Sequence, residues 1–140
     1  MSAISDYLEQ QLLTHLFRTS SYTKPTVIAI ALCTATPSDS STGATITEVA
    51  NSNNYSRVTV NPSNSNWSAI GVGGTTDNVA EIAFGQASGS WGTVTSIAIV
   101  DSATWGAGNM LFYGDLAVAK AITSGDTFKI AIGDLDVTLA

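Results

Sequence analysis

Hydrophobic residues near the start of the chain recur at spacings of three and four, the pattern of an amphipathic helix. The apolar positions are Leu8, Leu12, Leu13, Leu16 and Phe17. Ser5 or Asp6 can cap the start of this helix, and Glu9 follows Asp6 at the spacing of a capping box. Arg18 falls in the last turn, where a cation suits the carbonyl end of the helix dipole. The pattern predicts a helix over residues 5–18.

After Pro25, which cannot continue a helix, the pattern changes to that of a strand. Residues 26–34 (TVIAIALCT) are β-branched and apolar at successive positions, so we expect a strand covered on both faces. The N-terminal helix is the expected cover on one side and an opposing sheet on the other. Residues 35–44 are rich in Pro, Ser, Asp, Thr and Gly, and a loop of that length is more often functional than decorative.

Most of the remaining chain consists of short apolar or alternating segments separated by polar turns. Further strands are predicted over residues 55–61, 79–84, 93–100, 110–116, 127–132 and 135–139. In the first of them Val58 and Val60 point inward and Arg57 outward, and residues 93–100 are apolar on both sides and hence central. Residues 133–134 (GD) are typical of a two-residue hairpin turn, and residues 71–74 (GVGG) of a flexible turn.

Regularly spaced short strands predict a mostly β protein: an antiparallel β-sandwich or barrel-like fold of about 7–8 strands with one N-terminal amphipathic helix. The chain has 140 residues, so we expect a single domain over residues 1–140. Hydrophobic residues make up 44% of it, enough to form one core. Charged residues make up only 11%, below the usual share of roughly 25%.

The charge pattern argues against nucleic acid as a partner, because the net charge is −6 and the five cations are scattered along the chain. No apolar run has the length of a membrane span, so we expect no membrane partner. The start does not combine a basic segment with an apolar run, so folding in a cytoplasm is expected.

Side chains for catalysis or metal binding are few. His15 is the only histidine and lies on the polar side of the predicted helix, whereas Cys33, the only cysteine, falls in an apolar strand. One cysteine allows no intrachain disulfide. Asp134 and Asp136 lack the further oxygen ligands of a calcium loop, and no cluster has zinc spacing. We therefore predict no enzymatic activity, no cofactor and no metal.

The three tryptophans, Trp67, Trp91 and Trp105, fall in or beside predicted loops. Each ring can anchor a turn on the core, which is the commoner role. Alternatively, the rings contact a partner, because tryptophan is over-represented at interface hot spots. Sugar stacking is the third possibility.

The order of these motifs resembles a family of small tailed-phage virion proteins, often labelled tail-fibre proteins and similar in size and fold to capsid cement proteins. The N-terminal resemblance lies in residues 5–9 (SDYLE), 12–13 (LL), Phe17, 22–25 (YTKP) and 32–37 (LCTATP). The later resemblance lies in residues 55–57 (YSR), 83–84 (AF), 90–94 (SWGTV), 111–114 (LFYG) and 124–128 (SGDTF).

The resemblance implies a non-enzymatic virion protein, and our first hypothesis is a capsid decoration or cement protein on the outer surface of the phage head. Its partners would be the major capsid protein and further copies of itself in a homodimer or homotrimer. An acidic exterior protein also avoids the packaged genome. The alternative is a tail tip or tail fibre component involved in host adsorption.

A glycan-binding or glycan-cleaving module is a third hypothesis, which requires a groove with a tryptophan and two nearby carboxylates. For the virion hypotheses, the expected contacts are in the N-terminal segment, the loop after the first strand, and the loop tryptophans. The predicted contact residues are Ser2, Ile4, Tyr7, Thr36, Pro37, Asp39, Trp67, Trp91 and Trp105.

Overall fold

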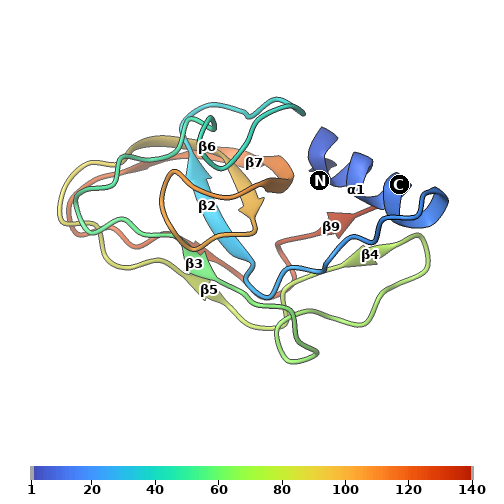
Figure 1. The fold of residues 1–140 in the computed structure, drawn as a ribbon. Coiled ribbons are helices and arrows are strands. Elements are labelled where there is room, and N and C mark those ends of the chain that lie inside the picture. The colour runs from blue at the N-terminus through green and yellow to red at the C-terminus, as the bar shows by residue number, and fades with distance from the viewer. Residues whose placement is uncertain (1, 140) are drawn as a thin grey trace.

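The protein is described from a computed structural model, which covers residues 2–139. Its main element is a five-stranded antiparallel sheet with the order β1-β7-β6-β2-β3 (Figure 1). The strands of this sheet are β1 (Ala3–Ile4), β2 (Ala29–Cys33), β3 (Val58–Thr59), β6 (Gly92–Val100) and β7 (Met110–Ile122). β6 lies at the centre, as predicted from its apolar residues on both faces.

Two short antiparallel pairs form the rest of the β structure. β4 (Thr75–Thr76) pairs with β9 (Val137–Thr138), and β5 (Ile82–Ala83) pairs with β8 (Lys129–Ile130). One face of the large sheet packs on these pairs through a core cluster that includes Ile30, Val94, Ile99, Phe128 and Ile130. The predicted sandwich-like, mostly β fold with one N-terminal helix is confirmed, with nine strands among residues 2–139.

Helix α1 (Asp6–Phe17) begins and ends where the sequence predicts. Ser5 is the N-cap: its hydroxyl accepts the Leu8 N–H at 3.2 Å and donates to the Met110 carbonyl at 2.5 Å. Because Asp6 is already helical, the capping box proposed from Asp6 and Glu9 is wrong. The Ser5 contacts join the start of the helix to the first residue of β7.

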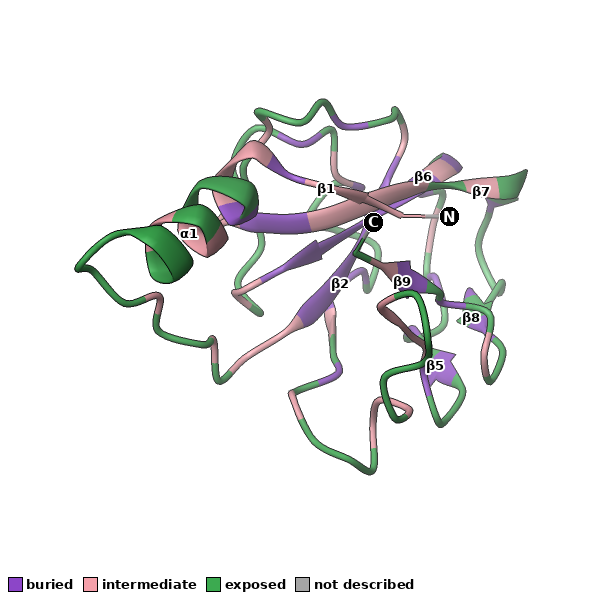
Figure 2. Cartoon of the chain, turned by 90° about the vertical axis from the view of Figure 1, so that its right-hand side faces the viewer, coloured by how far each residue is buried: buried purple, intermediate pink, exposed green. Residues whose placement is uncertain are grey.

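The prediction that this helix covers β2 is also wrong. The outer face of β2 packs in a second cluster formed mainly by Ala29, Ala31, Cys33, Ile46 and Met110. Ile46 belongs to the long loop after β2, so this loop supplies part of the cover that we had assigned to the helix. Helix α1 instead lies beside β7 and projects away from the sheet (Figure 2).

Several predicted strands are shorter or pair differently than expected. Residues 131–134 form a turn, closed by the Asp134 N–H on the Ala131 carbonyl at 3.1 Å and with Gly133 at a φ of 77°, yet this turn does not close a hairpin. The strands on either side of it, β8 and β9, pair with β5 and β4 in separate sheets. Residues 71–74 form a hydrogen-bonded turn, in which the Gly71 N–H donates to the Thr75 carbonyl at 2.9 Å.

Strand β7 is longer than predicted and irregular in its middle. Ser96 pairs with Asp115, but Val94 pairs with Lys120, so β7 has extra residues between these two points. Such a bulge bends a strand and interrupts its ladder. On its outer edge, β7 pairs with β1 only at Phe112 and Tyr113.

Candidate functional site

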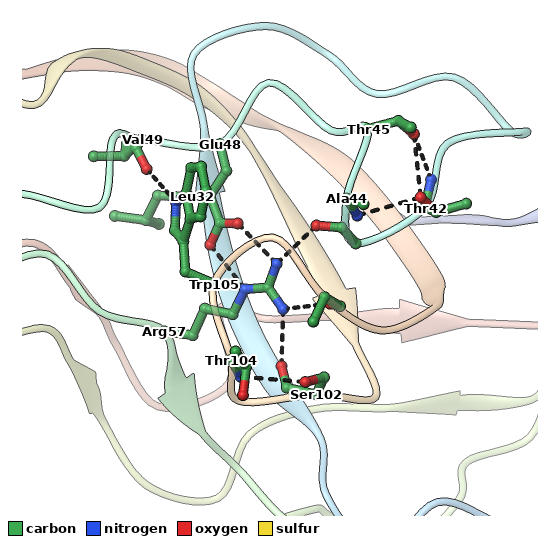
Figure 3. A network of polar contacts seen from close by, with 12 residues as sticks. Leu32, Thr42, Ala44, Thr45, Glu48, Val49, Arg57, Ser102, Thr104 and Trp105 are labelled. Carbon is green, nitrogen blue, oxygen red and sulfur yellow. Dashed lines mark hydrogen bonds and ion pairs between the residues drawn. The ribbon is translucent and has the colours of Figure 1, made fainter.

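A buried ion pair holds together the loops at one end of the large sheet (Figure 3). Arg57 Nε and Nη2 each donate to one carboxylate oxygen of Glu48 at 2.8 Å. The Arg57 side chain is fully enclosed. Arg57 also donates to the carbonyls of Gly43, Ser102 and Ala107 at 2.8 to 3.0 Å. A single guanidinium therefore fixes the loop before Glu48 and the loop between β6 and β7.

Arg57 points away from the inter-sheet core, as strand alternation predicts, but it is buried, whereas an outward residue was expected to meet solvent. The two loops that it binds then cover it and leave it only 6% exposed. The alternation of residues along a strand does not predict that distant loops bury an outward side chain. The available signal was Glu48, which lies nine residues before the only arginine of the β region.

Tyr55 extends the same network into the core. Its hydroxyl donates to Glu48 at 2.8 Å and accepts the Leu32 N–H at 3.0 Å. Burial and the nearby Glu48 charge raise the pKa of the Tyr55 hydroxyl. Burial, with a further contribution from Glu48, also raises the pKa of the Cys33 thiol to about 12, so the thiol stays protonated at neutral pH.

The loop of residues 36–43 meets the start of α1 and β7, so two of the predicted contact segments form one surface. The Asp6 N–H donates to the Asp39 carbonyl at 3.0 Å, and the Asp39 carboxylate accepts the Tyr113 hydroxyl. This hydrogen bond raises the pKa of Tyr113 to about 12. Thr36 donates to Asp115 of β7 at 2.6 Å.

The other predicted contact residues near this surface differ in exposure. Ser2, Ile4 and Tyr7 are half-buried, and the Ser2 hydroxyl accepts the Thr138 N–H at 2.9 Å. Pro37 is buried, so its ring belongs to the packing of the loop. Its prediction as a contact residue is corrected: a covered ring offers no surface to a partner.

All three tryptophans use the indole N–H to hold a backbone carbonyl. Trp67 donates to Val60, Trp91 to Asn53 and Trp105 to Val49, at 2.8 to 3.0 Å. Trp91 is 5% exposed and packs edge-on against Tyr55, so it is a core residue and its prediction as a contact is corrected. Trp67 is half-buried, whereas Trp105 is exposed enough for its ring to meet a partner.

The largest apolar exposure on a regular element lies at the end of α1. Leu13, Leu16 and Phe17 are 58%, 69% and 76% exposed, whereas Leu8 of the same predicted stripe is buried. Leu12 is half-buried, so the stripe packs on the protein at its start and is exposed at its end. Exposed apolar residues that gather on one face mark interaction surfaces more often than scattered ones do. We call these three residues the α1 patch.

A groove of about 480 Å³ lies between β7, from Phe112 to Lys120, and the C-terminal segments of the opposite layer. Its floor is apolar and includes Phe112, Leu116 and Phe128, while Asp115, Asp134 and Asp136 stand along it. We call it the β7 groove. From the sequence, Asp134 and Asp136 were considered only as calcium ligands. Their place along a groove could not be predicted, because the groove forms only when β7 and the C-terminal strands come together.

The only histidine and the only cysteine of the chain have structural contacts. His15 Nδ1 accepts the Tyr22 N–H at 3.1 Å, and Cys33 is buried in the second core cluster. Among residues 2–139, no three His, Cys, Asp or Glu side chains gather as a metal site. No helix in this range is both long enough and apolar enough to cross a membrane.

The fold is a small β-sandwich with a projecting amphipathic helix, an exposed apolar patch and a groove. The sequence comparison identifies the particular class: residues 3–138 match the model of the family described as podophage GP4 fiber I protein gp80. Because the match covers almost the whole chain, the protein belongs to this family and is a phage virion component of the fibre type. No curated relative matches the sequence at a significant level.

Proposed function

We propose that this protein is a non-enzymatic component of a phage tail fibre and that it acts by binding other protein subunits. The observation that carries the proposal is the family match over residues 3–138, whose description names a fibre protein. It supports the tail alternative of the sequence analysis over the head-cement hypothesis that came first there.

The structure supports an assembly role rather than catalysis. Two groups that could act in acid-base or nucleophilic chemistry are enclosed in the fold: Glu48 is bound by Arg57, and the Cys33 thiol is buried with a raised pKa. By contrast, the α1 patch leaves three large apolar side chains in water. Covering them would be favourable, at roughly 25 cal/mol per Å² of apolar surface removed from water.

The test is the position and copy number of the chain on purified particles. Gold-labelled antibodies against this protein should mark the tail in electron micrographs, and quantitative mass spectrometry should give a small fraction of the major capsid protein's copy number. Labelling of the head, with a copy number comparable to the major capsid protein, would refute the tail proposal and restore the cement hypothesis.

A further inference from the structure

We propose that copies of this chain associate head to tail, with the α1 patch of one copy seated in the β7 groove of the next. The proposal goes beyond the proposed function, because it concerns self-association and does not depend on where the protein sits in the particle. Two features of the single chain carry it: an unpartnered apolar helix end with cations beside it, and an apolar groove with carboxylates along it.

The helix end is apolar and basic. Arg18 follows Phe17 directly, and the Tyr22 contact with His15 folds the next segment back along the helix, with Lys24 two residues further on. Two ion pairs occur among residues 2–139, and they use Arg57 and Lys129. Arg18 and Lys24 therefore keep exposed charges near the C-terminal end of α1, whereas the exposed anion Glu9 lies one turn before Leu13.

The groove is the complement of that surface. Asp115, Asp134 and Asp136 are exposed and take no part in the two ion pairs of the described chain. Lys129 also lines the groove, but it is paired with Glu81 at 3.3 Å, which leaves Lys120 as the opposing cation. The groove thus has an acidic excess, and its volume is in the range that protein pockets use to hold apolar groups.

The two surfaces cannot meet within one chain. In Figure 2, α1 projects on one side, whereas the second half of β7 and β8 lie on the other. No residue of α1 lines the groove. A contact between two different surfaces is heterologous, so repeated contacts give either a closed ring or an open chain of subunits. Complementary charge gives the contact its orientation and makes it salt-sensitive.

The first experiment uses two variants, each of which lacks one of the two surfaces, and measures their association alone and in a mixture. The helix variant carries Leu16→Ser and Phe17→Ser, and the groove variant carries Asp134→Lys and Asp136→Lys. All four side chains are exposed, so circular dichroism should show both variants folded. In sedimentation velocity, each variant alone should be monomeric at concentrations where the unchanged protein associates. Self-association should be weakened by about tenfold or more, as for truncated hot-spot residues.

The decisive sample is the mixture of both variants, in which one keeps an intact groove and the other an intact patch. Head-to-tail docking predicts a one-to-one heterodimer that cannot grow further. A monomeric unchanged protein, a mixture without heterodimer, or undiminished association of either variant would overturn the proposal. Ile70→Ser with Val72→Ser is the matched control, because it removes two apolar side chains that are at least as exposed as Leu16 and lie outside both surfaces, and it should leave association unchanged.

A charge exchange tests the electrostatic part. Arg18→Glu with Lys24→Glu should weaken association, as should the groove variant. The chain carrying all four changes should associate again, because the opposite charges face each other once more. Failure of this four-site variant to recover, while it remains folded, would refute the assignment of these charges to one contact. Recovery of association at a strength similar to the unchanged protein supports it.

Discussion

Replacing Arg57 by methionine should be among the most destabilising single changes in this protein. The guanidinium makes five hydrogen bonds, two to Glu48 and three to main-chain carbonyls of two loops. Methionine fills part of the volume but leaves the Glu48 carboxylate buried without its cation. Removing one partner of a buried pair typically destabilises by about 3–5 kcal/mol, which is a large share of the roughly 5–15 kcal/mol stability of a domain.

The assay is urea unfolding followed by far-ultraviolet circular dichroism at neutral pH. If the uncompensated Glu48 charge is the main cause, a second change, Glu48→Gln, should restore part of the lost stability in the Arg57→Met background. The same Glu48→Gln change in the unchanged protein should be destabilising, because it weakens an intact ion pair. The two changes are therefore strongly non-additive.

Without the cation, burial disfavours the charged form of the Glu48 side chain, which is why its neutral counterpart glutamine should recover stability in the Arg57→Met background. A loss below about 1 kcal/mol, or simple additivity with Glu48→Gln, would refute the reasoning.

Three further predictions concern other parts of the fold. Ser5→Ala removes the helix cap and the bond to Met110, so unfolding measurements should show a loss of about 0.5–2 kcal/mol. Gly43→Ala would bring a Cβ to 2.1 Å from the Ala107 carbonyl oxygen, so this variant should unfold at lower denaturant, whereas Gly106→Asn, at a φ of 70° in open space, should be tolerated. Since the pKa of Cys33 is raised from 9.0 to about 12, the protonated thiol contributes stability that is lost as pH rises from about 9 to 12. The Cys33→Ala variant should therefore lose less stability over this pH range in unfolding measurements. A loss of stability as steep as in the unchanged protein would contradict this.

Sequence patterns predicted the elements whose signal is local. The helix over residues 5–18 was found with its boundaries, because apolar spacing and the Ser5 cap are properties of neighbouring residues. The central position of residues 93–100 followed from their apolar character on both faces. The pairing of β8 and β9 was missed, because the turn at residues 133–134 has hairpin chemistry but its strands find partners elsewhere in the chain.

The candidate surfaces were predicted less well. The N-terminal segment and the loop of residues 36–43 do meet, through Asp6, Asp39 and Tyr113. Residue type alone, however, gave Trp91 and Pro37 as contacts, and both are buried. Tryptophan favours interfaces and cores alike, since its large ring gains from burial in either place, so only its neighbours in space decide between them.

Periodicity and charge follow from the order of residues, so the sequence indicates a mostly β, acidic protein with one amphipathic helix. Three properties emerge only in the folded molecule: most of the apolar stripe of that helix stays in water, Arg57 is enclosed, and three aspartates share one groove. These properties depend on contacts between segments far apart in the chain. Burial and electrostatics act through distance in space, which the order of residues does not give.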